Sequence, residues 1–401
     1  MLAPEFLPVL GGVGTYIVEL VRHLPRSVEI HVVTPRRIKL GKEKISSEDY
    51  VLSEYFKSNI HTHFVSRASD TFVYNAAFQY ACMRYIPRFL KEQGIDLIHS
   101  HTAHMPDILL QWKRPRIPTI TTVHTTIQGQ RAGTQLSGMG FSKLGFSEKM
   151  TYALYPLLRT AEKIYLSKAK KFIFVSKWMR DQLQEQYPKR NFSSAPIVYN
   201  SVDVKQFSPD EFSSNEKDKR DMVLFTGRMT AAKGAVFLTR AIPEVIREFP
   251  DVVFTFIGPG NSRVYEEMLR KRGISATNYL FLGYLKESHD LIKYYRTAAI
   301  YVAPTLYENL PIRILEAMAC ETPVVASSVC AIPEIIESGE NGLLVPPGSP
   351  NKLAQSICML LGDPGLRRRM GRSARRIVER KFSWEQNAQK TYEIYERVLV
   401  D

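Results

Sequence analysis

The sequence predicts an α/β fold with two domains, and three observations lead to that prediction. The chain has 401 residues, which is long for one hydrophobic core and comfortable for two. Short β-branched apolar runs alternate with segments of helical periodicity, a rhythm typical of parallel βαβ units. The rhythm restarts after a charged, turn-rich segment at residues 208–219. We therefore expect a first domain over 1–205, a linker over 206–220 and a second domain over 221–383.

Apolar patterning predicts the elements of the first domain. Alternating or short apolar runs predict strands at residues 28–34, 95–101, 117–123, 171–175 and 196–203. Apolar residues at helical spacing predict helices through 18–24, over 75–93 and over 149–167. Residues 36–44 read as a basic connector. Residues 125–149 are rich in glycine and serine, so we expect a long irregular segment there.

The second domain repeats this pattern. Short apolar runs predict strands at 222–226, 252–257, 280–285, 300–303, 323–326 and 342–345, and helical spacing predicts helices over 350–361, over 366–380 and after residue 384. The helix over 366–380 carries seven arginines. We interpret them as the solvated basic face of an amphipathic helix, with a membrane or nucleic-acid surface as the alternative.

Composition limits the class of protein. Lys and Arg number 54 against 40 Asp and Glu, a net charge of +14, which favours acidic partners such as nucleoside diphosphates, anionic lipids or nucleic acid. No apolar run approaches the ~18 residues that suggest a membrane span, and the first residues lack the pattern of a secretory signal. The four cysteines show no metal-binding spacing. We expect reduced thiols in a cytoplasmic setting.

Two carboxylates stand out in residues 299–328. Glu308 follows the apolar run 300–303 in a predicted loop, and Glu316 lies on the helix that Pro311 can begin. Two acids seven residues apart are ordinarily two solvated side chains. Here a buried strand delivers Glu308 at its carboxyl end, where open α/β sheets bind ligands. The start of the helix favours an anion in the same crevice.

The run YEN…P…LEAMAC…TPVVAS resembles the Glu-x7-Glu signature of the retaining, nucleotide-sugar-dependent glycosyltransferases of family 4. The resemblance implies the GT-B fold, in which two Rossmann-like, doubly wound parallel-sheet domains face each other across a cleft. It also implies that Glu316 holds the ribose hydroxyls of the nucleotide and that Glu308 lies beside the donor sugar. Asn309 and Leu310 would belong to the donor site, although Asn309 stands where glycine is common in the family.

Basic residues follow the predicted strand 222–226 in the run Gly227-Arg228-Met229-Thr230-Ala231-Ala232-Lys233-Gly234. An arginine can bind two phosphate oxygens in a bidentate manner, and a lysine supplies a point charge. In most positions, however, an Arg and a Lys five residues apart are simply surface charges. The run resembles the diphosphate-binding loop of family 4, which implies donor-binding roles for Gly227, Arg228 and Lys233. Gly258 and Leu285 lie at two further strand ends, and the resemblance implies that they contact the nucleotide base through backbone atoms. Because backbone contacts leave little trace in the sequence, the identity of the base is not predicted.

Candidate residues of the first domain lie near Gly11, Gly12 and Gly14. Alone, this loop is weakly specific, because a plain tight turn explains it equally well. In the resembled family the corresponding loop packs against the donor diphosphate and shapes the acceptor side. His124 ends the predicted strand 117–123, and the resemblance implies contact with the donor sugar or its reacting carbon. The alternative is a hydrogen-bonded core histidine, the role that we expect for His101 and His104.

Three further features compare with the family. A full apolar strand usually precedes the glycine loop, and this chain offers only residues 1–3, so we expect coding sequence upstream. The terminal helix over 384–401 resembles one that crosses back onto the first domain. The glycine-rich segment 125–149 either frames the acceptor pocket or is a disordered insertion.

The resemblance implies a retaining hexosyltransferase. It would move a sugar from a nucleoside diphosphate sugar, UDP-linked first and GDP-linked next, to a hydroxyl acceptor such as a lipid-linked sugar, a glycan or a small molecule. No metal, other cofactor or nucleic-acid partner is expected, because side chains and a helix start meet the diphosphate charge and the chain lacks an Asp-x-Asp triplet. Many members of the resembled family act in cell-surface polysaccharide or glycolipid assembly. The resemblance therefore implies such a role, in the cytoplasm or peripherally at the inner membrane face.

Three alternatives stay open. A glycoside hydrolase also uses two carboxylates, yet it has no use for the Arg-x4-Lys loop. A GT-B nucleotide-sugar epimerase would release no nucleotide when given a second sugar. A non-enzymatic basic protein that binds nucleic acid or membrane would explain the charge of +14 and leave the strand-end motifs unexplained.

Overall fold

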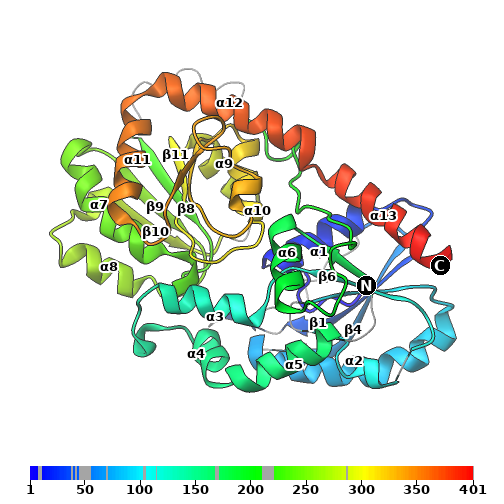
Figure 1. Cartoon of the computed structure of the whole chain (residues 1–401). Coiled ribbons are helices and arrows are strands. Elements are labelled where there is room, and N and C mark those ends of the chain that lie inside the picture. Colours follow the sequence, from blue (N-terminus) through cyan, green and yellow to red (C-terminus); the bar gives the residue numbers. More distant parts are fainter. Residues whose placement is uncertain are drawn as a thin grey trace. The chain divides into compact units, whose positions relative to one another are not determined.

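The computed structural model describes residues 1–7, 11–37, 39–40, 43–44, 56–68, 71–102, 105–113, 115–167, 171–209, 221–285 and 288–400 (Figure 1). The chain forms two compact units. The first comprises Met1–Ile127, Leu154–Asn200 and Trp384–Asp401, and the second comprises Gln128–Ala153 and Ser201–Ser383. The backbone therefore passes between the units four times.

A parallel sheet forms the centre of the first unit. β1 (Ile30–Arg37) pairs with β4 (Ile60–Ala68), and β5 (Ile98–His101), β6 (Thr119–Val123) and β7 (Lys171–Phe174) follow in that order. The opening residues join the two groups, because the N–H of Leu2 donates to His99 and that of Ala3 donates to Val33. β2 (Lys39–Leu40) and β3 (Glu43–Lys44) form a small antiparallel pair.

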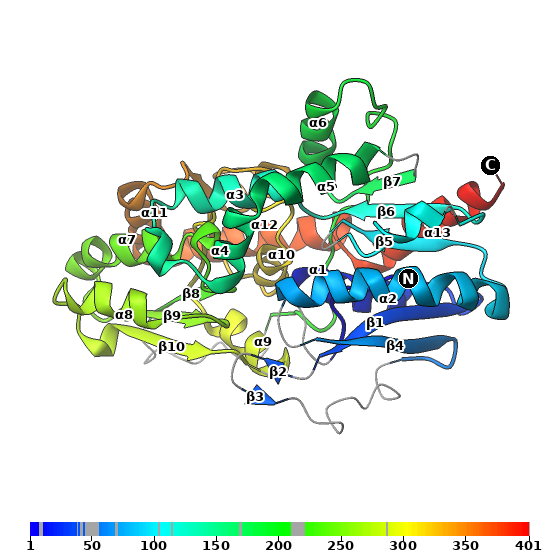
Figure 2. The same cartoon turned by 90° about the horizontal axis from the view of Figure 1, so that it is seen from below.

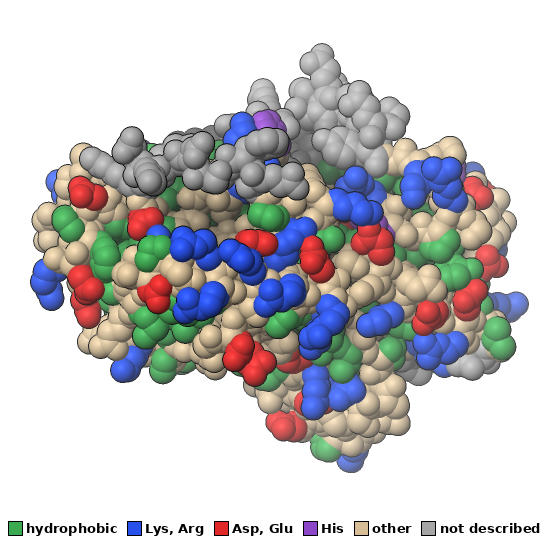
Figure 3. Space-filling view, turned by 90° about the horizontal axis from the view of Figure 1, so that it is seen from above, with side chains coloured by type: hydrophobic (Ala, Val, Ile, Leu, Met, Phe, Trp, Pro, Cys, Tyr) green, Lys and Arg blue, Asp and Glu red, His purple; other side chains and the backbone are tan. Residues whose placement is uncertain are grey.

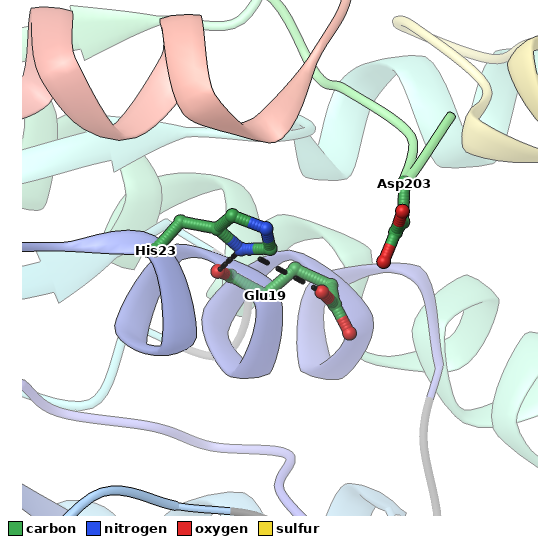
Figure 4. A group of neighbouring side chains, drawn as sticks. All are labelled: Glu19, His23 and Asp203. Atoms are coloured by element: carbon green, nitrogen blue, oxygen red, sulfur yellow. Dashed lines mark hydrogen bonds and ion pairs between the residues drawn. The ribbon is translucent and has the colours of Figure 1, made fainter. Parts of the chain in front are cut away.

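Helices cover this sheet. They are α1 (Gly12–His23), α2 (Thr71–Gln93), η3 (Leu110–Lys113), α5 (Tyr155–Ser167), α6 (Lys177–Gln186) and α13 (Trp384–Val400). α2 lies along β1 and β4 and buries Phe78, Cys82 and Ile86 against them (Figure 2). On α1, the ring Nδ1 of His23 lies 2.8 Å from the carbonyl oxygen of Glu19 (Figure 4). Figure 4 also draws Asp203, which belongs to the second unit.

The last helix, α13, completes the first unit as the resemblance implied. Its first residue, Trp384, is buried with its ring edge-on to Tyr16, the centroids 5.5 Å apart. Its Tyr395 hydroxyl lies 2.6 Å from Nδ1 of buried His99 on β5. The end of the chain is thus part of the core that its beginning forms.

The second unit has a parallel sheet of six strands in the order β10-β9-β8-β11-β12-β13. The strands are β8 (Met222–Thr226), β9 (Val253–Ile257), β10 (Tyr279–Gly283), β11 (Ile300–Ala303), β12 (Val324–Ser327) and β13 (Leu343–Val345). Their apolar side chains, such as Phe225, Phe254 and Val302, form one buried cluster with the adjoining helices. Strand order reverses between β8 and β11, which makes that position the topological switch point.

Helices lie on both faces of this sheet. α7 (Ala235–Glu248) packs with α11 (Pro350–Gly362) on one face, and α9 (Ser288–Thr297) with α10 (Ile312–Ala319) on the other (Figure 1). The remaining helices are α3 (Ile127–Leu136), η4 (Phe141–Lys143), α4 (Phe146–Ala153), η6 (Ala231–Lys233), α8 (Arg263–Arg270), η7 (Ala276–Asn278), η8 (Ile332–Glu334) and α12 (Pro364–Lys381).

The glycine-rich segment 125–149 differs from the prediction. It is helical in α3 and α4, and most of it belongs to the second unit although it falls in the range 1–205 expected for the first domain. The predicted helix 149–167 is two helices, α4 and α5. Glycines of α3 let the helix approach a neighbouring side chain closely, and this tertiary packing outweighs their low helix propensity.

One predicted strand is absent from the structure, and one observed strand was not predicted. Residues 196–203 form no strand and make only isolated bridges, Phe174 with Ile197 and Val202 with Ser383. Conversely, β4 was not predicted, because His61 and His63 interrupt its apolar pattern. Both histidines contact His31 on the neighbouring strand β1. The Nε2 of His63 lies 3.0 Å from Nδ1 of His31, and the ring of His61 stacks on that of His31.

The arginine-rich helix is α12, and two of its arginines are not part of a solvated face. Arg367 donates to the carbonyls of Leu360 and Leu361 at the end of α11. Arg375 donates to the carbonyls of Ala319 and Phe207. The others, such as Arg368, are exposed, and basic side chains lie among acidic ones over the face seen in Figure 3.

Some predictions fall outside the described residues. These are residues 8–10 before the glycine loop, His104, part of the basic connector 36–44, and residues 210–220 of the linker. Within the described part of the chain, no helix is both long and apolar enough to span a bilayer.

Candidate functional site

The carboxyl ends of β8 and β11 meet at the switch point of the second sheet, and the predicted donor residues follow them. β8 leads into Gly227 and Arg228 and then into η6, which ends at Lys233. β11 leads into the loop that carries Glu308. Neighbouring parallel strands end at the same edge, so these groups converge.

Glycines allow the strand-end loops to pack tightly. Gly227 and Gly258 have φ angles of 147° and 145°, and a Cβ on Gly258 would collide with the carbonyl oxygen of Gly227. Gly234, with φ of 71°, begins α7 and lies directly against the carbonyl of Pro304. The Arg228 loop is therefore held between the ends of β9 and β11.

Lys233 and Glu308 form an ion pair. Both side chains remain partly accessible, at 29% and 24%. Burial, together with the charges of Arg228 and Arg313, lowers the pKa of Lys233 to about 7. Glu308 supplies one negative charge to this corner, and Glu316 pairs with Arg313. With Lys233 protonated, one positive charge is left over, and an anion would balance it.

Glu316 is buried on α10 and fixed by two donors. The Tyr295 hydroxyl and Nη1 of Arg313 each donate to its Oε2 at 2.8 Å. Its other oxygen, Oε1, accepts no hydrogen bond from the residues that the structure describes. One carboxylate oxygen is thus anchored, and the other keeps its capacity to accept.

Arg313 and Tyr295 join the candidate site through Glu316, and the sequence analysis did not name them. Burial alone would lower the pKa of Arg313, yet the adjacent Glu316 carboxylate raises it above the ordinary value. Burial, reinforced by Glu316, raises the pKa of Tyr295 well above its ordinary value, so its hydroxyl stays a donor. The Thr226 hydroxyl lies 2.8 Å from Tyr295 and ties Glu316 to the end of β8. The position of Arg313 three residues before Glu316 on a helix was the available signal.

Two of the other donor-site candidates directly follow Glu308 in the chain. Asn309 and Leu310 are buried between Glu308 and Pro311, which is the N-cap residue of α10. The start of α10 is therefore next to Glu308, as the sequence suggested. Leu285 is partly exposed two residues beyond β10.

The glycine loop of the first unit begins α1. Gly11 is the N-cap residue, and a Cβ there would collide with the carboxylate of Glu5. A Cβ on Gly12, the first helical residue, would meet nothing within 4 Å, whereas Gly14 is buried. A side chain at position 11 would therefore displace the Glu5 carboxylate, whose approach to this loop was not predicted.

His124 follows β6 and is only 8% exposed. Its Nε2 lies 3.0 Å from Nδ1 of His101, and its ring contacts Tyr16 at a centroid distance of 4.7 Å. Burial lowers the pKa of His124 to about 3, although nearby Glu5 opposes the shift. At neutral pH the ring is uncharged, so it can exchange hydrogen bonds but carries no positive charge.

The structure thus groups the candidates by unit. Arg228, Lys233, Glu308 and Glu316 come together in the second, while His124 and the glycine loop belong to the first. The fold of two parallel-sheet α/β domains is that of GT-B glycosyltransferases, and comparison with solved structures confirms it. Sucrose-phosphate synthase of Thermosynechococcus elongatus superposes with a TM-score of 0.75 at 20% identity, covering 97% of this chain and 94% of that one. Anabaena HepE, solved in complex with UDP and glucose, superposes with a TM-score of 0.71 at 16% identity, covering 98% of each chain.

Family models define the protein more closely. Residues 10–206 match the model described as Glycosyltransferase Family 4, and residues 220–363 match the one described as Glycosyl transferases group 1. The chain belongs to this glycosyltransferase family.

Curated relatives agree with this assignment. An alpha-maltose-1-phosphate synthase of Mycolicibacterium smegmatis is 26% identical over 99% of this chain and 98% of its own. An uncharacterized glycosyltransferase of Methanocaldococcus jannaschii is 29% identical over 75% of each chain. A phosphatidyl-myo-inositol mannosyltransferase of M. smegmatis is 24% identical over 99% of this chain and 93% of its own.

Proposed function

We propose that this glycosyltransferase moves a hexose from a nucleoside diphosphate sugar to a hydroxyl acceptor and retains the anomeric configuration. The observation that carries the proposal is the convergence of Lys233, Arg228 and Glu308 at the switch point of the second unit. A diphosphate supplies the anion that such a corner favours. The buried carboxylate of Glu316 nearby suits the hydroxyls of the attached ribose.

Charge stabilisation is the main catalytic contribution. Arg228, Lys233 and the start of α10 would meet the negative charge that grows on the diphosphate as it leaves. Lys233 would exchange its present partner, Glu308, for phosphate oxygens. Glu308, once released, would orient the donor sugar by accepting from its hydroxyls. The departing phosphate oxygen would assist the incoming hydroxyl on the same face, so no enzyme nucleophile is required.

Glu316 would select the nucleotide part of the donor. Oε2 is held by Tyr295 and Arg313, which leaves Oε1 to accept from a ribose hydroxyl. Because the carboxylate is already fixed in place, little conformational freedom is lost when the ribose binds.

The neutral ring of His124 suits a hydrogen bond to an uncharged sugar hydroxyl rather than to phosphate. Gly11, Gly12 and Gly14 would give the backbone of the first unit access to the substrate. We propose no metal and no other cofactor, since two basic side chains and a helix start neutralise the diphosphate. UDP-linked sugars are the first candidates and GDP-linked sugars the next, with a lipid-linked sugar, a glycan or a small molecule as acceptor.

One assay tests the proposal. Release of nucleoside diphosphate is measured from a panel of UDP, GDP and ADP sugars, with and without hydroxyl acceptors and with a metal chelator. We expect release to require an acceptor and to survive the chelator, and NMR of the product to show the anomeric configuration of the donor. A hydrolase would release free sugar from a glycan, and an epimerase would convert the donor without releasing nucleotide. Absence of nucleotide binding and of turnover across the panel would contradict the proposal.

A further inference from the structure

Residues Gln128–Ala153 contribute to the second unit far ahead of the rest of it in the sequence. They comprise α3, η4 and α4. Their contacts with the rest of the second unit include the Arg228–Lys233 loop, the residue before Glu308, and α8. Two of these places bear directly on charged residues of the candidate site.

Glu148 on α4 holds the start of η6. Its Oε1 accepts the N–H of Ala231 at 3.0 Å, and its Oε2 accepts the N–H of Gly145 at 3.0 Å. Ala231 is the first residue of η6, whose last residue is Lys233. An N–H group at the start of a helical turn has no acceptor within that turn, so an outside carboxylate fixes its position. Glu148 therefore restrains the loop that carries Arg228 and Lys233.

α3 holds the residue that precedes Glu308. A Cβ on Gly129 would collide with the ring of Tyr307, and a Cβ on Gly133 would lie 2.6 Å from the Cβ of Tyr307. Only glycine permits this approach at either position. The helix thereby restricts where Tyr307, and with it the backbone of Glu308, can lie.

A third contact anchors the segment away from the charged residues. The hydroxyl of Tyr265 on α8 lies 4.0 Å from Sδ of Met139, which packs against the core of the second unit. Burial, with the Glu148 charge adding to it, raises the pKa of Tyr265 to about 12. The segment is thus packed independently of its contacts with the two loops.

We propose that Gln128–Ala153 is a positioning element of the donor site, in which Glu148 sets the diphosphate loop and α3 sets Tyr307 and Glu308. This inference rests on the proposed function. Glu148 bonds to loop backbone, so it acts through Arg228 and Lys233. It should therefore influence the binding of diphosphate more than that of a nucleoside monophosphate, which lacks the outer phosphate.

Calorimetry on full-length variants tests the role of Glu148. The probes are the nucleoside diphosphate that binds the wild type most tightly and the matching monophosphate. We expect Glu148→Ala to weaken the diphosphate about tenfold and the monophosphate less than twofold. Glu148→Gln keeps an oxygen acceptor for Ala231 and should stay within about threefold of the wild type. Lys143→Ala, an exposed change on the same segment, is the matched control.

A second variant tests α3. Gly129→Ala crowds Tyr307, to which the three atoms nearest the new Cβ belong, so kcat at saturating donor should fall about tenfold while diphosphate affinity stays unchanged. Melting temperatures of all variants identify any that are unfolded at the assay temperature.

The outcomes separate the two proposals. If the wild type binds no nucleoside diphosphate, the proposed function fails. If the wild type binds one and Glu148→Ala binds it equally well, the positioning role is wrong and the function stands. Equal losses for monophosphate and diphosphate would mean general destabilisation, which also overturns the positioning role.

Discussion

At the scale of single residues, the charge of Lys233 depends on pH and on the bound ligand. Its pKa of about 7 lies far below the ordinary lysine value, so the unliganded site loses this proton near neutrality. A bound diphosphate favours the charged form and raises the pKa again. Binding therefore takes up a proton when the pH lies between the two values.

This proton uptake predicts the pH dependence of donor binding. Affinity for the nucleoside diphosphate should be full below pH 7 and should fall as the pH rises to 9, by up to about tenfold per pH unit. Calorimetry across that range measures it. Lys233→Arg, whose guanidinium stays charged, should flatten the profile. An unchanged slope in that variant would assign the pH dependence to another group.

Arg228 should matter for turnover. Arg228→Ala removes a charged donor from the leaving diphosphate, and we expect kcat to fall about 100-fold to 1000-fold, or about 2.7–4 kcal/mol. Arg368→Ala on α12 is a suitable control, since it removes an equal charge from an exposed position. Equal effects of the two substitutions on steady-state rates would mean that only net charge counts.

Glu316 should matter for binding. Glu316→Gln keeps the side chain's shape but weakens its bonds with Tyr295 and Arg313, and we expect nucleotide affinity to fall about tenfold or more, about 1.5–3 kcal/mol. Titration with the nucleoside diphosphate measures the loss. Glu316→Ala should in addition lower the melting temperature, because it removes the carboxylate to which both Tyr295 and Arg313 donate. Wild-type affinity in both variants would remove Glu316 from the donor site.

At the scale of elements, α13 is tied to β5 through one buried hydrogen bond. Tyr395→Phe removes the hydroxyl that bonds His99 and leaves a buried ring nitrogen without this partner. We expect the free energy of unfolding to fall by about 1–3 kcal/mol. Thermal melting followed by tryptophan fluorescence measures it, with Lys390→Ala on the exposed face of α13 as control. No change in the melting temperature would mean that another group replaces the hydroxyl.

The elements also differ in how well the sequence predicts them. β11, α10 and β8 follow from apolar runs and a helix-starting proline, and Glu308 and Glu316 lie on the loop and helix as expected. α3 was unpredictable, because its glycines signal a loop locally and only Tyr307, distant in sequence, explains them. β4 was missed because His63, a polar residue in the sequence pattern, packs against His31 of β1 and Phe89 of α2. Arg313 and Tyr295 gave no signal alone, since their roles come from a bond to Glu316.

At the scale of the whole molecule, the two units have separate hydrophobic cores and an unequal distribution of tryptophan. All three tryptophans, Trp112, Trp178 and Trp384, belong to the first unit. Fluorescence therefore reports the unfolding of the first unit, and circular dichroism reports both. A nucleotide that binds the second unit stabilises that unit by mass action.

We therefore expect nucleoside diphosphate to raise the midpoint of a transition seen by circular dichroism and to leave the fluorescence transition nearly unchanged. Parallel thermal scans with both probes, with and without ligand, provide the measurement. Equal shifts in the two signals would instead show that the units unfold together.

The four passages of the backbone between units set the order in which the protein can fold during synthesis. α3 and α4 leave the ribosome long before the strands β8 to β13 on which they pack, so they have no apolar partner until those strands emerge. The first unit lacks α13 until translation has passed the second unit. The half that is made first is consequently finished last, after the second unit is already complete.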